Sequence, residues 1–411
     1  MRRPLLLLLA LGLLSCRHAP EAPPVPATAA LAYPEPAPPA LRLPDSVQPV
    51  RYALELTLLP AEDRYPGTVT IDVEVRSPVR QVWLHAQDVE VQAAWVQHSG
   101  RALEARPVDA GGGRLGLMLT EELPRGPARI VINFKGRVER TRSQGLYAET
   151  EAGEPYLYTF FEPIDARRAF PCFDEPGFKV PWQLTFTVKE GHVAAANAPV
   201  VREEPLPGGL KRVTFAQSKP MPSYLVAFMV GPFDVVEAGT VGREPVPLRF
   251  IVPRGRGAET AYAARVSARI VGELEDYFDQ PYPYEKLEVA VVPRYWGTME
   301  HPGLVAMGQP LTLIRPEEET LERRQRYAHI FGHELGHYWF GNVVTCRWWD
   351  DVWLNESFTS WLDRKTMDGF EPGWGLGREF SAQSLAQAMA ADSLLNTPPV
   401  RKPVASNDDI I

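Results

Sequence analysis

The sequence has no excess of basic residues and little cysteine. Its 43 lysines and arginines are outnumbered by 51 aspartates and glutamates, which gives a formal net charge of −8 at pH 7. Because there is no basic patch, nucleic acid is not expected as a partner. Only three cysteines occur in 411 residues. Neither Cys172 nor Cys346 stands beside a partnered histidine, so catalysis by a cysteine nucleophile is not expected. Both are expected as buried free thiols, although spacing alone does not decide whether they form a disulfide.

The sequence also lacks an apolar run long enough to span a bilayer comfortably. Two arginines precede a short apolar stretch over residues 5–14, which is typical of a secretory signal. Residues 13–16 read Leu-Leu-Ser-Cys and resemble a bacterial lipoprotein cleavage box. We therefore predict a lipoprotein signal peptide over residues 1–16, with the lipid on Cys16. An ordinary signal peptide cut elsewhere is the alternative.

Residues 17–44 are rich in proline and alanine and are expected to form an extended tether. Together with the signal, they predict an exported bacterial lipoprotein, anchored to a membrane on the periplasmic face or at the cell surface.

The remaining chain is longer than one core usually fills, so at least two domains are expected. Apolar residues alternate with polar ones at Tyr52, Leu54, Leu56 and Leu58, at Val69, Ile71, Val73 and Val75, at Ile130, Ile132 and Phe134, and at Trp182, Leu184, Phe186 and Val188. This period of two predicts half-buried antiparallel strands, with turns such as the three glycines at 111–113. Residues 45–240 are therefore predicted to form an N-terminal β-sandwich or saddle.

Residues 241–411 predict a second domain of mixed α and β structure. Helical spacing is clear at Tyr262, Val266, Ile270 and Leu274. A strand is expected over residues 287–292. Pro316 and the three glutamates after it are a favourable helix start, and Gly341 is a favourable stop. No internal repeat is evident.

The residues at 333–337 read His-Glu-Leu-Gly-His, and Glu356 follows after eighteen further residues. In a helix, His333 and His337 lie one above the other and can offer two imidazoles to one metal. Glu356, expected to open a helix that ends near Gly369, completes a set of two histidines and one glutamate. This set suits one catalytic Zn²⁺ that keeps a position open for water. Glu334 is then the general base for attack by a zinc-bound water. The alternative is a pair of solvated or core histidines and an acidic residue at a helix start.

A second motif lies upstream, where residues 297–301 read Gly-Thr-Met-Glu-His. With the zinc motif, with residues 161–176 and with the Trp-Phe-Gly-Asn run from Trp339, it resembles the aminopeptidase N family of zinc metallopeptidases. The leukotriene epoxide hydrolases also belong to that family. The resemblance extends from about residue 46 to the end, and it implies a thermolysin-like catalytic domain.

The resemblance also implies a substrate site for peptides with a free N-terminus. Glu300 and Glu162 match the positions that bind the α-amine, and Gly297 and Thr298 those that pair with the substrate backbone. A structural salt bridge is the alternative for Glu300. Two positions depart from the family pattern, because Phe160 stands in place of glutamine and His301 in place of asparagine.

Family members place an oxyanion-binding tyrosine roughly sixty residues beyond the third zinc ligand. The sequence ends at Ile411, before that point, so it is interpreted as a family member truncated at its C-terminus. Tyr338 does not match the tyrosine position. Three residues are candidates to orient the histidines: Asp350, Asp351 and Asn355. Four tryptophans are expected in the core rather than in a substrate-stacking surface: Trp348, Trp349, Trp353 and Trp361.

The sequence therefore predicts a zinc aminopeptidase. A peptide-binding or scaffold lipoprotein that keeps the zinc site without turnover is the alternative from another class. A thermolysin-like endopeptidase is disfavoured by Glu300 and Glu162. Epoxide hydrolysis and side-chain preference cannot be inferred from these motifs.

Overall fold

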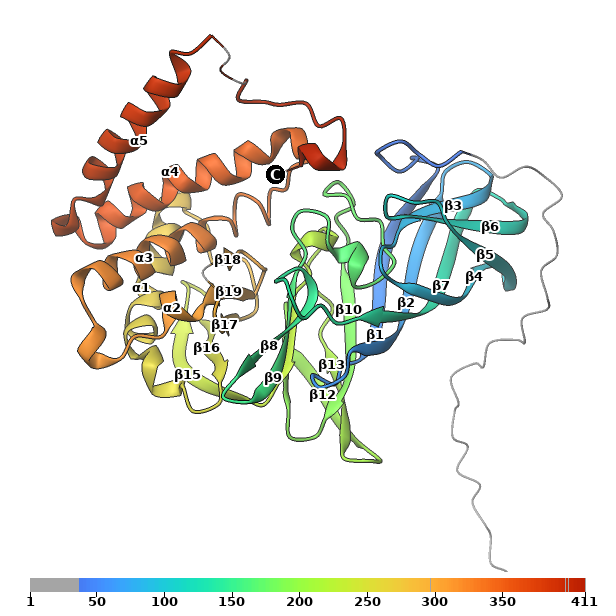
Figure 1. Ribbon diagram of the computed structural model, residues 1–411, viewed down its shortest axis with the longest axis horizontal. Coiled ribbons are helices and arrows are strands. Elements are labelled where there is room, and N and C mark those ends of the chain that lie inside the picture. The colour runs from blue at the N-terminus through green and yellow to red at the C-terminus, as the bar shows by residue number, and fades with distance from the viewer. Residues whose placement is uncertain (1–36, 296, 396, 398, 411) are drawn as a thin grey trace, which may run out of the picture. The chain divides into compact units, whose positions relative to one another are not determined.

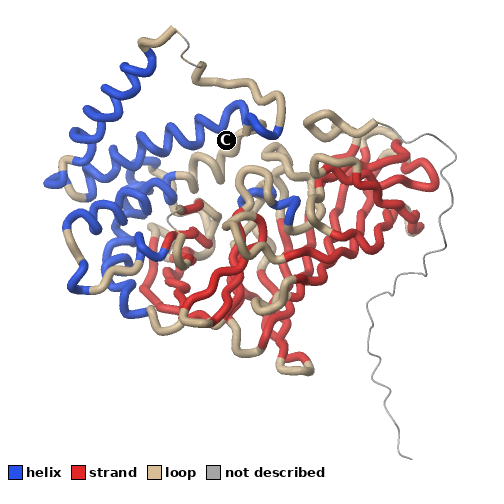
Figure 2. The backbone as a smooth tube through the Cα atoms, in the orientation of Figure 1, coloured by secondary structure: helices blue, strands red, loops and turns tan. Residues whose placement is uncertain are grey.

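The computed structural model describes residues 37–410 apart from 296, 396 and 398 (Figure 1). Cys16, the predicted signal peptide and most of the predicted tether lie outside these residues. Strands dominate the first half of the described chain and helices the last third (Figure 2). The predicted class, an N-terminal β domain followed by a mixed α and β domain, is confirmed. Within the described residues, no helix is both long and apolar enough to cross a bilayer.

The N-terminal part is built on a ten-stranded sheet in the order β12-β13-β10-β1-β2-β7-β4-β5-β6-β3. Its strands are β1 (Val47–Thr57), β2 (Arg64–Val75), β3 (Val79–His85), β4 (Glu90–His98), β5 (Arg101–Asp109), β6 (Arg114–Leu123), β7 (Gly126–Arg137), β10 (Trp182–Lys189), β12 (Val200–Leu206) and β13 (Leu210–Phe215). The period of two is realised, since Leu54 and Leu56 are buried while Glu55 between them is exposed. The prediction of antiparallel pairing is wrong at one place. There β1 and β10 run parallel, with the rings of Tyr52 and Trp182 stacked at 3.8 Å between centroids.

A second sheet, of four strands, includes the strand that precedes Glu162 of the predicted amine site. Its order is β11-β14-β9-β8. The strands are β8 (Gly145–Glu151), β9 (Glu154–Phe160), β11 (Val193–Ala196) and β14 (Phe228–Gly231). The hydroxyl of Tyr158 in β9 donates to the backbone oxygen of Val291, 3.1 Å away in the next sheet. Glu162 follows directly after β9, so this contact helps to hold it beside the second half of the chain.

A five-stranded sheet in the order β15-β16-β17-β19-β18 lies under the helices. Its strands are β15 (Phe233–Val241), β16 (Val246–Pro253), β17 (Leu287–Val292), β18 (Thr298–Met299) and β19 (Leu304–Gly308). The strand expected at 287–292 is confirmed, and all six of its residues are buried. Strand β15 lies almost entirely within the range 45–240 that the sequence assigned to the N-terminal domain, yet it pairs with β16 in this sheet.

The helices are α1 (Ala261–Phe278), α2 (Gln309–Thr312), α3 (Leu321–Gly336), α4 (Val352–Phe370) and α5 (Leu376–Asp392). Helices α1, α3 and α4 pack against one another. Ile270 and Leu274 of α1, Phe331 and Leu335 of α3 and Leu362 of α4 are fully buried in their shared core. Short 3-10 helices occur at Ala166–Arg168, Ser223–Leu225, Gly257–Thr260, Pro316–Glu318, Trp349–Asp351, Pro372–Trp374 and Asn407–Asp409.

Three predicted helix boundaries need correction. Pro316 begins a 3-10 turn, and α3 starts only at Leu321, where the side chain of Thr320 accepts the backbone N–H of Arg323 at 3.3 Å. Helix α3 ends at Gly336 rather than at Gly341. Glu356 does not open its helix, because α4 begins at Val352; the predicted end near Gly369 is confirmed at Phe370.

The two cysteines in the described chain are both free. Cys172 is fully buried as expected, and burial raises the pKa of its thiol well above the usual value. Cys346 is only partly buried. The free thiol is therefore the state of both, and the open alternative of a disulfide is removed.

Candidate metal centre

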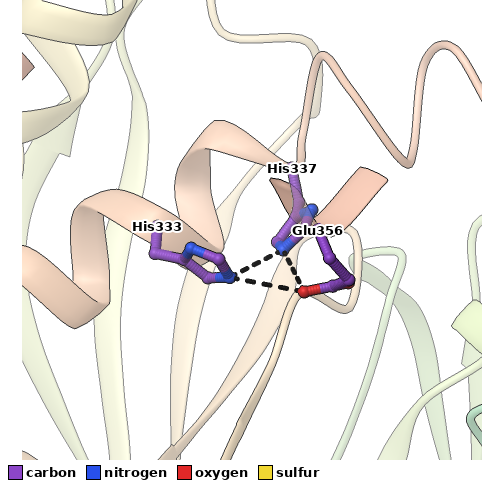
Figure 3. Close-up of side chains that lie close together, drawn as sticks. All are labelled: His333, His337 and Glu356. Carbon is purple, nitrogen blue, oxygen red and sulfur yellow. Dashed lines mark hydrogen bonds and ion pairs between the residues drawn. The ribbon is translucent and has the colours of Figure 1, made fainter. Parts of the chain in front are cut away.

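Two helices bring the predicted zinc ligands together. His333 lies on the last turn of α3, His337 is the residue that caps its C-terminus, and Glu356 reaches them from the second turn of α4 (Figure 3). Nε2 of His333 lies 3.0 Å from Nε2 of His337. Oε2 of Glu356 lies 3.7 Å from the first nitrogen and 3.8 Å from the second. One ligand atom from each residue thus faces a common point.

These separations fit a zinc ion. Tetrahedral ligands at about 2.0–2.1 Å from zinc lie about 3.3–3.4 Å from one another, and the three observed edges of 3.0, 3.7 and 3.8 Å bracket that length. The donor set of two imidazoles and one carboxylate is also the one that catalytic zinc uses. The side chain of Glu356 is 48% exposed, so the fourth direction is not closed by packing around this ligand.

The second nitrogen of each histidine is held by a neighbour from α4. Nδ1 of His337 lies 2.7 Å from Oδ1 of Asn355 and 3.2 Å from Oγ1 of Thr359. Nδ1 of His333 lies 3.3 Å from Oδ2 of Asp363. Because an imidazole that donates through Nδ1 leaves Nε2 bare, these contacts select the tautomer that binds metal through Nε2.

Of the three residues predicted to orient the histidines, only Asn355 does so. Asp350 and Asp351 instead form ion pairs with Arg401, at 3.2 and 2.7 Å. Asp363 was not predicted, although its spacing from Glu356 indicates a position on the same face of the helix. It follows Glu356 by seven residues, which is two helical turns, so both carboxylates lie on the face of α4 that meets α3.

Gly341 has a role other than ending a helix. Its φ is 131°, and a Cβ at this position would collide with Oδ1 of Asn355. Glycine therefore lets the chain after α3 pass close to the amide that holds His337.

The protein environment raises the pKa of both His333 and Glu334. Burial acts to lower the pKa of His333, but the carboxylates of Asp363 and Glu356 outweigh it and raise the pKa to about 10. Zinc binding must then displace a proton from this ring. Burial raises the pKa of Glu334 to about 7 despite the opposing effect of the two histidines. Glu334 is 4% exposed, and its Oε1 accepts a hydrogen bond from Oγ1 of Thr298 at 2.6 Å.

Gly297 and Thr298 lie at the edge of the five-stranded sheet. Thr298 belongs to β18, which pairs with β19 on one side and is the last strand in the sheet order. A Cβ at Gly297 would collide with the ring of Tyr295. An edge strand next to the predicted zinc ligands offers unpaired backbone groups to an extended peptide.

A second group of carboxylates adjoins the predicted metal ligands. Carboxylate oxygens of Glu162, Glu300 and Glu356 all lie within 4.8 Å of one another. Glu300 is 3% exposed, and its Oε1 accepts a hydrogen bond from Nδ2 of Asn355 at 3.2 Å. Burial, followed by repulsion from Glu300, raises the pKa of Glu162 well above its usual value. In the described chain no lysine or arginine forms an ion pair with Glu162 or Glu300, so the salt bridge considered for Glu300 is not formed.

Tyr338 forms a hydrogen bond with the backbone of His301. The hydroxyl of Tyr338 donates to the backbone oxygen of His301 at 2.7 Å, and both side chains are buried. Burial lowers the pKa of His301 to about 3, so the ring stays neutral. Tyr338 is therefore committed to a structural contact.

The four tryptophans do not share one environment. Trp349 is buried against Tyr224, as predicted. Trp348 and Trp353 are partly buried. The core assignment is wrong for Trp361, which is 49% exposed on α4 beside Tyr277.

Models of known protein families match most of the described chain. Residues 48–225 match the peptidase M1 N-terminal domain, and residues 262–411 match the peptidase family M1 domain. Aminopeptidase M1-A of Oryza sativa subsp. japonica is 35% identical over 382 residues, which is 90% of this chain and 43% of that protein. Glutamyl aminopeptidase of Bos taurus is 32% identical over 381 residues, covering 90% of this chain and 40% of that protein. Aminopeptidase M1 of Arabidopsis thaliana is 34% identical over 370 residues, covering 87% and 42%. The chain thus spans about two fifths of the length of these relatives.

Proposed function

The chain belongs to the M1 family of peptidases, and we propose that it is a zinc aminopeptidase that removes N-terminal residues from peptides. One observation carries this proposal. Glu356 belongs both to the proposed metal ligands and to the group of three carboxylates. A peptide whose ammonium group sits among the carboxylates therefore has its first peptide bond beside the metal position, which is the geometry that exopeptidase cleavage requires.

In this proposal His333, His337 and Glu356 hold one Zn²⁺. When bound, the ion polarises the scissile carbonyl and lowers the pKa of water towards neutrality. Glu334 takes the proton of the attacking water and passes it to the leaving amine. Burial raises the pKa of its carboxyl, which favours the acceptance of a proton. The hydroxyl of Thr298 holds Oε1 of Glu334, which orients the carboxylate.

Glu162 and Glu300 are the proposed receptors for the substrate ammonium. A buried carboxylate and a partly buried one, neither of which has a basic partner in the described chain, are costly, and a protonated amine supplies the missing opposite charge. Glu162 comes from the proposed N-terminal domain (45–240) and Glu300 from the proposed catalytic domain (241–411), so the amine site needs both. The edge of β18 at Gly297 and Thr298 is the proposed place for the substrate backbone to add as a strand.

A pair of substrates tests the proposed function directly. Purified full chain supplied with zinc is offered an aminoacyl amide and the same amide with an acetylated amine. We expect hydrolysis of the free-amine substrate alone, because the acetyl group removes the charge that Glu162 and Glu300 recognise. Binding of the free peptide without hydrolysis contradicts the enzymatic role, and cleavage inside blocked peptides contradicts the exopeptidase role.

We also propose that the protein is a bacterial lipoprotein of the cell envelope, in which residues 1–15 are removed and Cys16 becomes the lipidated N-terminus. The support comes from the sequence alone. In a bacterial host, the full chain is expected in the membrane fraction, and Cys16→Ser is expected in the soluble fraction without the mass of the lipid. Cys346→Ser is the matched control and should remain with the membrane. Retention of Cys16→Ser in the membrane fraction contradicts the proposal.

A further inference from the structure

Helix α3 carries a third histidine that the zinc motif does not use. His329 precedes His333 by four residues, and His337, the C-terminal cap of α3, follows after four more, so the three histidines lie along the same side of this segment. On α4, Glu356 and Asp363 are likewise stacked two turns apart. The two faces meet, so that histidines from one helix alternate with carboxylates from the other.

Asp363 lies between two of these histidines. Its Oδ2 is 3.3 Å from Nδ1 of His333, and its Oδ1 is 3.2 Å from Nδ1 of His329. The side chain of Asp363 is only 1% exposed, whereas that of His329 is 31% exposed. One carboxylate therefore connects a zinc ligand inside the protein with a histidine that reaches the surface.

The buried charge of Asp363 depends on this second histidine. Within the described part of the chain, Oδ1 makes no well-aligned hydrogen bond, and Nδ1 of His329 lies 3.2 Å from it. The guanidinium of Arg364 is also near, since its Nε lies 3.9 Å from the same oxygen. Without His329, rotation of the carboxylate towards Arg364 would also draw Oδ2 away from His333, because a buried charge follows its remaining partners.

We propose that His329 is a positioning residue for the metal centre: it holds one oxygen of Asp363 so that the other stays on Nδ1 of His333. His333 then presents Nε2 to zinc in a fixed orientation. The inference rests on the proposed zinc site and assigns no contact between His329 and substrate. Its effect reaches the metal through Asp363 alone.

Zinc affinity, measured by competition with a chromophoric chelator on the full chain, tests this role without requiring turnover. Loss of a residue that directly orients a ligand typically weakens metal binding about 10- to 100-fold, and His329→Leu, one contact further away, is expected to weaken it about 3- to 10-fold. His329→Asn places an amide N–H near the position of Nδ1 and should restore affinity to within about twofold. Gln325→Leu, one turn earlier on the same face, is the matched control and should leave the affinity unchanged.

A double-mutant cycle separates positioning from general stability. In an Asp363→Asn background, His329→Leu should cause no further loss of zinc affinity, because the residue acts through that carboxylate. An additional loss in this background, equal weakening by His329→Asn, or unchanged affinity in His329→Leu overturns the inference. The proposed function has a separate outcome: failure of the unmodified chain to bind zinc contradicts the zinc site itself, whatever the variants do.

Discussion

Replacing Glu334 with glutamine is expected to lower kcat by about 10²- to 10⁴-fold, the usual contribution of a positioned general acid or base. Glutamine has nearly the same size and keeps an oxygen that can accept the hydrogen bond from Thr298, now 2.6 Å from Oε1. It cannot accept a proton at neutral pH. The substitution thus removes proton transfer while preserving the local packing of a side chain that is 4% exposed.

The measurement pairs steady-state hydrolysis of an aminoacyl amide with the zinc content of the same sample. Zinc content should stay at one ion per chain, because Glu334 is not among the three ligand residues. Glu322→Gln, an exposed position in the first turn of the same helix, should behave like the unmodified chain. A Glu334→Gln protein that retains zinc and hydrolyses at the normal rate would show that another group moves the proton.

Local pattern predicted the elements of this fold better than their partners. Alternation of apolar residues identifies β1 and β10 as strands, because burial on one face acts along each strand separately. The same alternation is compatible with parallel or antiparallel neighbours. It therefore could not predict that Tyr52 pairs with Trp182 in parallel across 130 residues of sequence. That pairing depends on the order and direction of all the strands in the sheet.

The predicted start of α3 was wrong because two plausible helix-start signals lie close together in the sequence. Pro316 with its acidic neighbours is a favourable start on composition, but Thr320 supplies a side-chain acceptor to the backbone N–H of Arg323. The hydrogen bond to the backbone decides where α3 begins. Helix propensity alone does not show which of the two starts is used, since Pro316 and Thr320 lie within five residues of each other.

In the site, too, residues that follow a local pattern were easier to predict than the partners that they contact. The convergence of His333, His337 and Glu356 was predictable because their spacing follows from helix geometry and from the coordination that zinc prefers. Their supporting residues were harder to predict. Asp350 and Asp351 look equally suitable in sequence, yet both pair with Arg401, about fifty residues later. Asp363 has the helical register for the role, but only the packing of α3 on α4 places it against His333.

Replacing Glu300 with glutamine is expected to lower kcat/KM for a free-amine substrate about 10- to 100-fold, since a hydrogen bond to a charged group contributes about 1.5–3 kcal/mol. Glutamine keeps an acceptor for Nδ2 of Asn355, which lies 3.2 Å from Oε1, so the support of His337 through Asn355 is retained. What is lost is the negative charge opposite the substrate ammonium.

A matched pair of substrates isolates that charge. For the unmodified chain, an aminoacyl amide should be hydrolysed far faster than the analogue that lacks the amine. In Glu300→Gln this preference should shrink, with the slow rate on the analogue and the zinc content both unchanged. An equal fall on both substrates would mean that Glu300 supports the metal centre rather than the amine, and an unchanged preference would leave amine recognition to other groups. Because Glu356 belongs both to the predicted metal ligands and to the carboxylate group, the preference for a free amine and the zinc content are the two quantities that must be measured together.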